Sequence, residues 1–278
     1  DSTAPTMTIT SSTVSSGTSS KATSIALTFT SSEVTTNFVA TDITLSGGSI
    51  GSLSGSGTVY TATFTPSGDG TKTINVAAGV FTDAVGNENT ASDTFTWTYD
   101  STGPTMTITS SSVSNASSSK ATSIALTFTS SEATTNFVAG DITLSGGSIG
   151  SLSGSGSVYT ATFTPSGDGQ KSINVAANKF TDAVGNENTA SDTFTWTYDT
   201  TGPTMTITSS TVSSGTSSKE TSIALTFTSS EVTTNFVATD ITLTGGSIGS
   251  LSGSGSVYTA TFTPSGDGQK SINVAANK

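Results

Sequence analysis

A period of 99 residues is the feature that most limits how this chain can fold. Identical residues recur at this spacing along the sequence, as at Pro5, Pro104 and Pro203. A unit of about a hundred residues is long enough to bury a core of its own, whereas the repeats of solenoid proteins are shorter. The sequence therefore predicts three tandem domains, the third lacking the last loop and strand, at residues 1–99, 100–198 and 199–278.

Within each repeat, apolar residues alternate with Ser and Thr in short segments separated by Gly, Pro, Asn and Asp. Such alternation is typical of strands with one buried face, and no segment has a helical period of useful length. In the first repeat we expect strands near residues 6–10, 24–30, 42–46, 50–53, 58–65, 72–78 and 94–99. About seven antiparallel strands in a hundred residues predict an all-β fold of tandem immunoglobulin-like β-sandwiches, arranged as an elongated rod.

Three local patterns give more specific expectations. Residues 31–37, which include Glu33, are expected to form a loop. The Asp69-Gly70 pair predicts a hairpin between the strands at 58–65 and 72–78, so Asp69 is expected to have a structural role. Trp97 shares a strand face with Phe95 and Tyr99. We therefore expect it in the core rather than as a platform for carbohydrate.

The composition excludes several classes of function. The net charge of −11, from 19 acidic and 8 basic residues, argues against nucleic acid as a partner. The chain has no Cys and no His, which excludes disulfides, zinc fingers and Cys or His nucleophiles. No run is apolar enough to predict membrane insertion. Neither a Ser–His–Asp set nor a paired-carboxylate cleft is evident, so we expect no enzymatic activity.

An acidic, amide-rich loop followed by a strand and a linker forms the joint between repeats, at residues 81–109 and again at 180–208. Successive strands of an antiparallel sandwich reverse direction, so this loop, the loop at 31–37 and the incoming linker should meet at one pole of the domain. Calcium takes about six to eight oxygen ligands from carboxylates, amides and carbonyls. The candidate Ca²⁺ ligands are Asp1, Glu33, Asp42, Asp83, Asn87, Glu88, Asp100, Glu132, Asp141, Asp182, Asn186, Glu187, Asp199, Glu231 and Asp240.

A second interpretation of these residues remains open. Asp and Asn favour turns because their side chains bond to the nearby backbone and they tolerate left-handed geometry. The loop after Asp83 also lacks the ligand spacing of an EF-hand. The oxygen-only ligand set favours calcium over turn chemistry alone.

Each repeat opens with D-S/T-T-x-P-T and contains an S-S-E segment, and the complete repeats continue with a T-D-A-V-G-N loop and a closing alternating strand. In these motifs, and over its whole length, the chain resembles the bacterial immunoglobulin-like (BIg) repeats of large surface adhesins. The resemblance implies a stalk of tandem domains, often with calcium at the joints, and does not imply an enzyme.

We therefore expect a structural spacer of an extracellular, adhesin-type protein on the bacterial cell surface, with neighbouring repeats joined head to tail. One alternative is the subunit of an extracellular filament, surface coat or phage fibre with homotypic contacts. Another is a carbohydrate- or protein-binding module that uses its polar loops.

Overall fold

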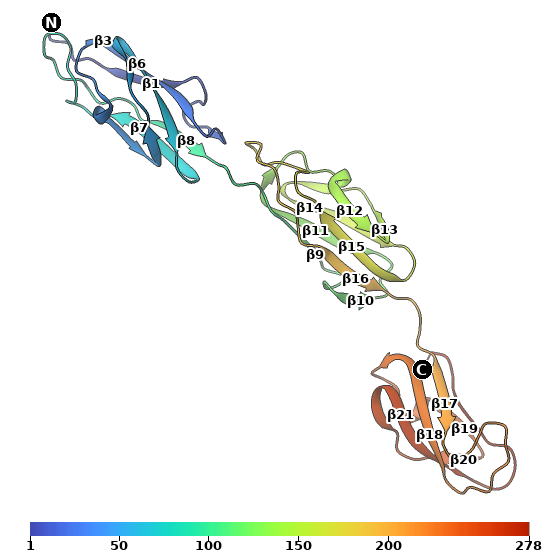
Figure 1. Cartoon of the computed structure of the whole chain (residues 1–278). Coiled ribbons are helices and arrows are strands. Elements are labelled where there is room, and N and C mark those ends of the chain that lie inside the picture. Colours follow the sequence, from blue (N-terminus) through green and yellow to red (C-terminus); the bar gives the residue numbers. More distant parts are fainter. Residues whose placement is uncertain (278) are drawn as a thin grey trace. The chain divides into compact units, whose positions relative to one another are not determined.

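The computed structural model describes residues 1–277, and each repeat in it forms its own set of β-strands (Figure 1). The chain divides into two compact units, Asp1–Asp199 and Thr200–Lys278. In the first repeat, one sheet has the order β1-β3-β6-β5 and the other the order β2-β8-β7-β4. The prediction of an all-β, immunoglobulin-like fold is confirmed. The strands are β1 (Met7–Ser11), β2 (Ser19–Ser20), β3 (Ile25–Thr35), β4 (Ile43–Ser46), β5 (Gly48–Ile50), β6 (Ser54–Pro66), β7 (Gly70–Val76) and β8 (Phe95–Tyr99).

The second repeat has the same two four-stranded sheets, with the orders β13-β14-β11-β9 and β10-β16-β15-β12. The third repeat has one sheet of order β17-β18-β21-β20 and a second sheet of only two strands, β19 and β22. The bounds are β9 (Met106–Ser110), β10 (Ser117–Ser119), β11 (Ile124–Thr134), β12 (Ile142–Ser145), β13 (Gly147–Ile149), β14 (Ser153–Pro165), β15 (Gly169–Val175), β16 (Phe194–Tyr198), β17 (Met205–Ser209), β18 (Ile223–Thr233), β19 (Ile241–Thr244), β20 (Gly246–Ile248), β21 (Ser252–Pro264) and β22 (Ser271–Val274).

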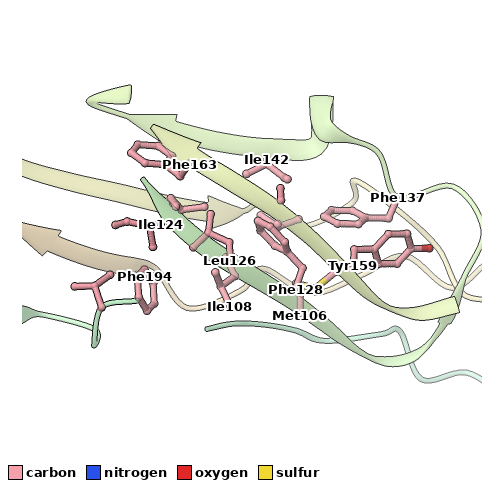
Figure 2. Close-up of a cluster of buried hydrophobic side chains, with 14 of the residues drawn as sticks. Met106, Ile108, Ile124, Leu126, Phe128, Phe137, Ile142, Tyr159, Phe163 and Phe194 are labelled. Carbon is pink, nitrogen blue, oxygen red and sulfur yellow. The ribbon is translucent and has the colours of Figure 1, made fainter. Parts of the chain in front are cut away.

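The core lies between the two sheets and is built from the alternating apolar residues of the strands. In the first repeat, Leu27 pairs with Ala62 and Phe29 with Tyr60 across β3 and β6, and all four side chains are buried. Figure 2 shows the corresponding core of the second repeat. Trp97 is 1% exposed, which confirms its predicted place in the core.

The Asp69-Gly70 turn does not close a hairpin, so that prediction was wrong. β6 pairs with β3 and β5, whereas β7 pairs with β4 and β8, and the turn therefore leads from one sheet to the other. Both strands bury one face in the same core, and two such faces pack across the sandwich. The Asp-Gly pair fixed where the chain reverses but not which strand becomes the neighbour.

Glu33 lies on a strand rather than in the expected loop. β3 continues to Thr35, and its register with β6 shifts between Thr30 and Thr35. The buried hydroxyl of Tyr60 donates a 2.8 Å hydrogen bond to the Thr35 carbonyl and holds the irregular segment in place. The same bond recurs from Tyr159 to Thr134 at 2.9 Å.

The helices among residues 1–277 are three single 3-10 turns, and none of them could cross a membrane. They are η1 (Ala40–Asp42), η2 (Ala139–Asp141) and η3 (Ala238–Asp240). Each turn ends directly before a strand: η1 before β4, η2 before β12 and η3 before β19.

Candidate metal centre

Three carboxylates gather at the pole of each of the first two repeats where the chain enters. One comes from the entering segment, one from the irregular part of β3 or β11, and one from the loop that precedes β8 or β16. In each group, one oxygen of every carboxylate lies within 4.8 Å of the others. The groups are Asp1, Glu33 and Asp83 in the first repeat, and Asp100, Glu132 and Asp182 in the second.

The loop before β8 fixes the Asp83 carboxylate through its own backbone. Oδ1 accepts hydrogen bonds from the N–H groups of Val85, Gly86 and Asn87 at 2.7–2.9 Å, and Oδ2 accepts one from the Asn87 amide at 2.7 Å. Burial raises the pKa of Asp83, but these hydrogen bonds together outweigh it and hold the pKa below its ordinary value of 3.8. The loop thus presents an ionised carboxylate to the cluster.

In the second repeat the same loop also holds the linker. Asp182 accepts hydrogen bonds from the Val184 and Asn186 backbone at 2.9 Å, and the Asn186 side chain donates one to the Asp100 carbonyl at 3.0 Å. Gly103 lies so close to the Glu187 carbonyl that a Cβ at this position would overlap it. The linker is therefore seated directly on the loop that carries Asp182.

Asp69 of the first repeat binds the other side of this linker. Its Oδ1 accepts hydrogen bonds from the Ser101 backbone at 2.9 Å and from the Ser101 hydroxyl at 2.7 Å, and its Oδ2 accepts one from the Thr102 hydroxyl. Hydrogen bonds from Thr102 and Ser101 hold the pKa of Asp69 below 3.8. Its expected structural role thus includes holding the linker. The sequence signal for this contact was an Asp-Gly turn in each repeat together with hydroxyl residues directly after Asp100.

The pKa of Glu132 reflects both its burial and the repulsion between the clustered carboxylates. Burial raises its pKa above the ordinary value of 4.5, and the negative charges of Asp100, Asp182 and Asp69 raise it further. Carboxylates from the first repeat, the linker and the second repeat therefore act on one side chain. A cation bound among them would remove this repulsion.

The donor set is that of a hard cation. Three clustered carboxylates supply oxygen ligands only, and calcium accepts such ligands in loose geometry, with water or carbonyl oxygens completing the shell. The side-chain amide nitrogens of Asn87 and Asn186 donate to the carboxylates of Asp83 and Asp182. Asn87 and Asn186, both predicted ligands, therefore hold these carboxylates in place through their amide nitrogens. To act as ligands of a cation, their side-chain amides would have to rotate and present the oxygen instead.

Several other predicted ligands lie outside the two groups. Asp42, Asp141 and Asp240 accept hydrogen bonds from the N–H groups of Val39, Val138 and Val237 at 2.8–2.9 Å, and so close the three 3-10 turns. Glu88 and Glu187 are exposed, and Thr82 and Thr181 form isolated bridges with them. In the third repeat, Glu231 lies on β18, Asp199 ends the first unit, and the position equivalent to Asp83 falls beyond residue 278.

Comparison with known proteins gives the family of the chain. The family model described as "Bacterial Ig-like domain" matches residues 1–99, 100–198 and 199–278. A solved structure of invasin, titled a bacterial integrin-binding protein, aligns with 15% identity and a TM-score of 0.37 over 96% of this chain. The chain spans 56% of the length of that protein. None of the curated proteins compared with it matches. The chain belongs to the bacterial Ig-like domain family and contains three tandem copies of that domain.

Proposed function

We propose that the chain is a structural spacer in an extracellular, adhesin-type surface protein, and that calcium stiffens its joints. The observation that carries this proposal is the position of Asp100. This linker residue brings its carboxylate within 4.8 Å of those of Glu132 and Asp182, which belong to the repeat that follows. A calcium ion held by all three would fasten the linker to that repeat without a disulfide, which a chain with no Cys cannot form.

The repeats themselves support a spacer. Copies that are nearly identical contribute length and number rather than separate chemistries. The two tryptophans, the side chains best suited to stack on a sugar, are each 1% exposed, which disfavours the carbohydrate-binding alternative. No contact within residues 1–277 favours a filament or a coat. We further infer that the chain is not an enzyme, because the carboxylates that gather at the joint repeat identically and hold a linker.

Calcium binding can be measured directly on the full chain. Isothermal titration calorimetry after treatment with a chelator should give two sites per chain, one for each group of three carboxylates. The double variant E132Q/D182N should lose one site. Its matched control is D192N, which removes a charge from an exposed acid of the same repeat and should keep both sites. Absence of binding by the unaltered chain would remove calcium from the proposal.

Stiffening requires a second measurement, because binding alone does not restrict motion. Because the chain has no Cys, the double variant S54C/S153C would carry only two thiols for spin labels. Both positions are exposed, one in the first repeat and one in the second. Double electron–electron resonance should give a narrow distance distribution with calcium and a broader one with chelator. E132Q/D182N should be broad in both conditions. Equal widths for the unaltered chain with and without calcium would mean that the linker contacts alone set the stiffness.

A further inference from the structure

A lysine is buried at the same position of the first two repeats. Lys72 on β7 is 2% exposed, and its counterpart Lys171 on β15 is 3% exposed. Lysine is almost never buried so completely unless its ammonium is paired, because it is costly to remove a charge from water. The contacts that offset this cost therefore indicate what the lysine does.

The ammonium of Lys72 binds the carbonyl oxygens of one turn. Its Nζ donates hydrogen bonds to the Ser67 carbonyl at 3.1 Å and to the Gly68 carbonyl at 2.6 Å. Nζ also lies 6.0 Å from the centroid of the Tyr99 ring, whose face attracts a cation. The equivalent contacts of Lys171 measure 3.0 Å, 2.6 Å and 5.9 Å. The lysine thus connects this turn to the strand that ends where the linker begins.

A glycine leaves room for the lysine side chain. Gly47 has a φ of +75°, and a Cβ at this position would lie 2.7 Å from Cδ of Lys72. Gly146 has a φ of +76°, and a Cβ there would lie 2.6 Å from Cδ of Lys171. The Gly47 carbonyl also accepts a 2.9 Å hydrogen bond from the Ser67 N–H. The residue that makes room for the lysine therefore also binds the turn.

The turn held by Lys72 carries Asp69, which binds the linker. Asp69 directly follows Gly68, and its carboxylate accepts hydrogen bonds from Ser101 and Thr102. Hydrogen bonds from Thr102 and Ser101 lower the pKa of Asp69 most, and the positive charge of Lys72 lowers it further. The lysine therefore acts on this contact in two ways, through the backbone of the turn and through its charge.

We propose that Lys72 is a positioning residue for the joint, which holds the turn at residues 67–70 in the conformation in which Asp69 binds the linker. An apolar side chain at this position would leave the Ser67 and Gly68 carbonyls without this donor. The proposal rests on the spacer function, because a spacer needs its linkers to be held, but it does not depend on calcium.

The test is hydrogen exchange of the Ser101 amide, followed by NMR on the full chain with chelator present. K72M keeps an unbranched side chain and removes the ammonium. Exchange should become faster by about threefold or more, because Asp69 is no longer held in place. K171M removes the equivalent lysine of the second repeat and should leave the rate at Ser101 unchanged. An unchanged rate in K72M, or an equal increase in K171M, would overturn the proposal.

A double variant separates positioning from general support of the fold. If Lys72 acts through Asp69, K72M should add nothing to the faster exchange of Ser101 in D69A, because coupled residues are not additive. Multiplied effects in D69A/K72M would overturn the proposal, since Lys72 would then act by another route. If the first repeat of K72M does not fold, K72Q, whose amide can still donate to a carbonyl, is measured in its place. These rates are measured without calcium, so their outcome is independent of calcium binding by the chain.

Discussion

At the scale of single residues, Asp69 shows how one side chain can hold a joint without belonging to its cluster of three carboxylates. Its carboxylate accepts three hydrogen bonds from Ser101 and Thr102, the two residues that follow Asp100. The pKa of Asp69 is lowered by these bonds, so the contact is complete above the ordinary value of 3.8 and is lost as the pH falls through the lower folded value. At neutral pH the linker is therefore held by an ionised group.

Replacing Asp69 with Ala should release the Ser101 amide. We expect hydrogen exchange of this N–H, followed by NMR, to become faster by about tenfold or more, because its acceptor is removed. The control is D267A, at the equivalent turn of the third repeat, which is not followed by a linker within the 278 residues. Unchanged exchange at Ser101 in D69A would mean that other contacts hold the linker.

Glu132 gives a prediction about pH. Its folded pKa lies above 4.5, so without calcium the folded state binds more protons than the unfolded state between these two values. The free energy of unfolding of the second repeat should therefore fall as the pH rises through this window. An NMR titration of Glu132 should give a pKa above 4.5 with chelator and a lower one with calcium. The same pKa in both conditions would argue against an ion beside this residue.

At the scale of elements, β5 shows how close packing restricts a short edge strand. Gly48 pairs with Pro66, and a Cβ at Gly48 would overlap the Phe64 ring and the Thr65 carbonyl. Phe64 is fully buried in the core. The glycine is thus required by the neighbouring strand, not by an unusual backbone angle.

The substitution G48A should therefore destabilise the first repeat by about 1–3 kcal/mol, as overpacking of a core commonly does. G51A is the matched control, since a Cβ there would lie 3.5 Å from its nearest neighbour, the Thr63 carbonyl. The free energy of unfolding of the first repeat can be measured for both variants by chemical denaturation, with hydrogen exchange of first-repeat amides as the readout. Equal stability of the two variants would show that β5 moves aside without cost.

At the scale of the whole molecule, the first two repeats use nearly the same sequence to build the same architecture. Each has two four-stranded sheets of equivalent strand order, and equivalent core positions such as Ile74 and Ile173 are fully buried in both. Burial of apolar surface drives folding, so these two repeats should have similar stability.

We expect the amides of β4 and β7 to exchange hydrogen at rates within about a factor of ten of those of β12 and β15, because the two pairs of strands lie in equivalent sheets. Native-state hydrogen exchange with mass spectrometry can compare these equivalent segments in one sample. A larger difference between the two repeats would contradict the predicted similarity.

The sequence by itself determined the features that depend on neighbouring residues. The alternation of Ile25, Leu27 and Phe29 was enough to place a strand with one buried face, and the period of 99 was enough to predict a tandem array. The opposite directions of successive strands were enough to bring Glu33 and Asp83 to the same pole. These inferences succeed because periodicity and chain reversal are local properties.

The tertiary structure alone decided which elements become neighbours. It separated Asp42, which closes a 3-10 turn, from Glu33, which joins the carboxylates, although both had been candidates on equal terms. It also placed β6 and β7 in different sheets despite the Asp-Gly turn between them. The physical reason is that strand pairing and side-chain contacts depend on packing between segments far apart in the chain, where many partners satisfy the same local pattern.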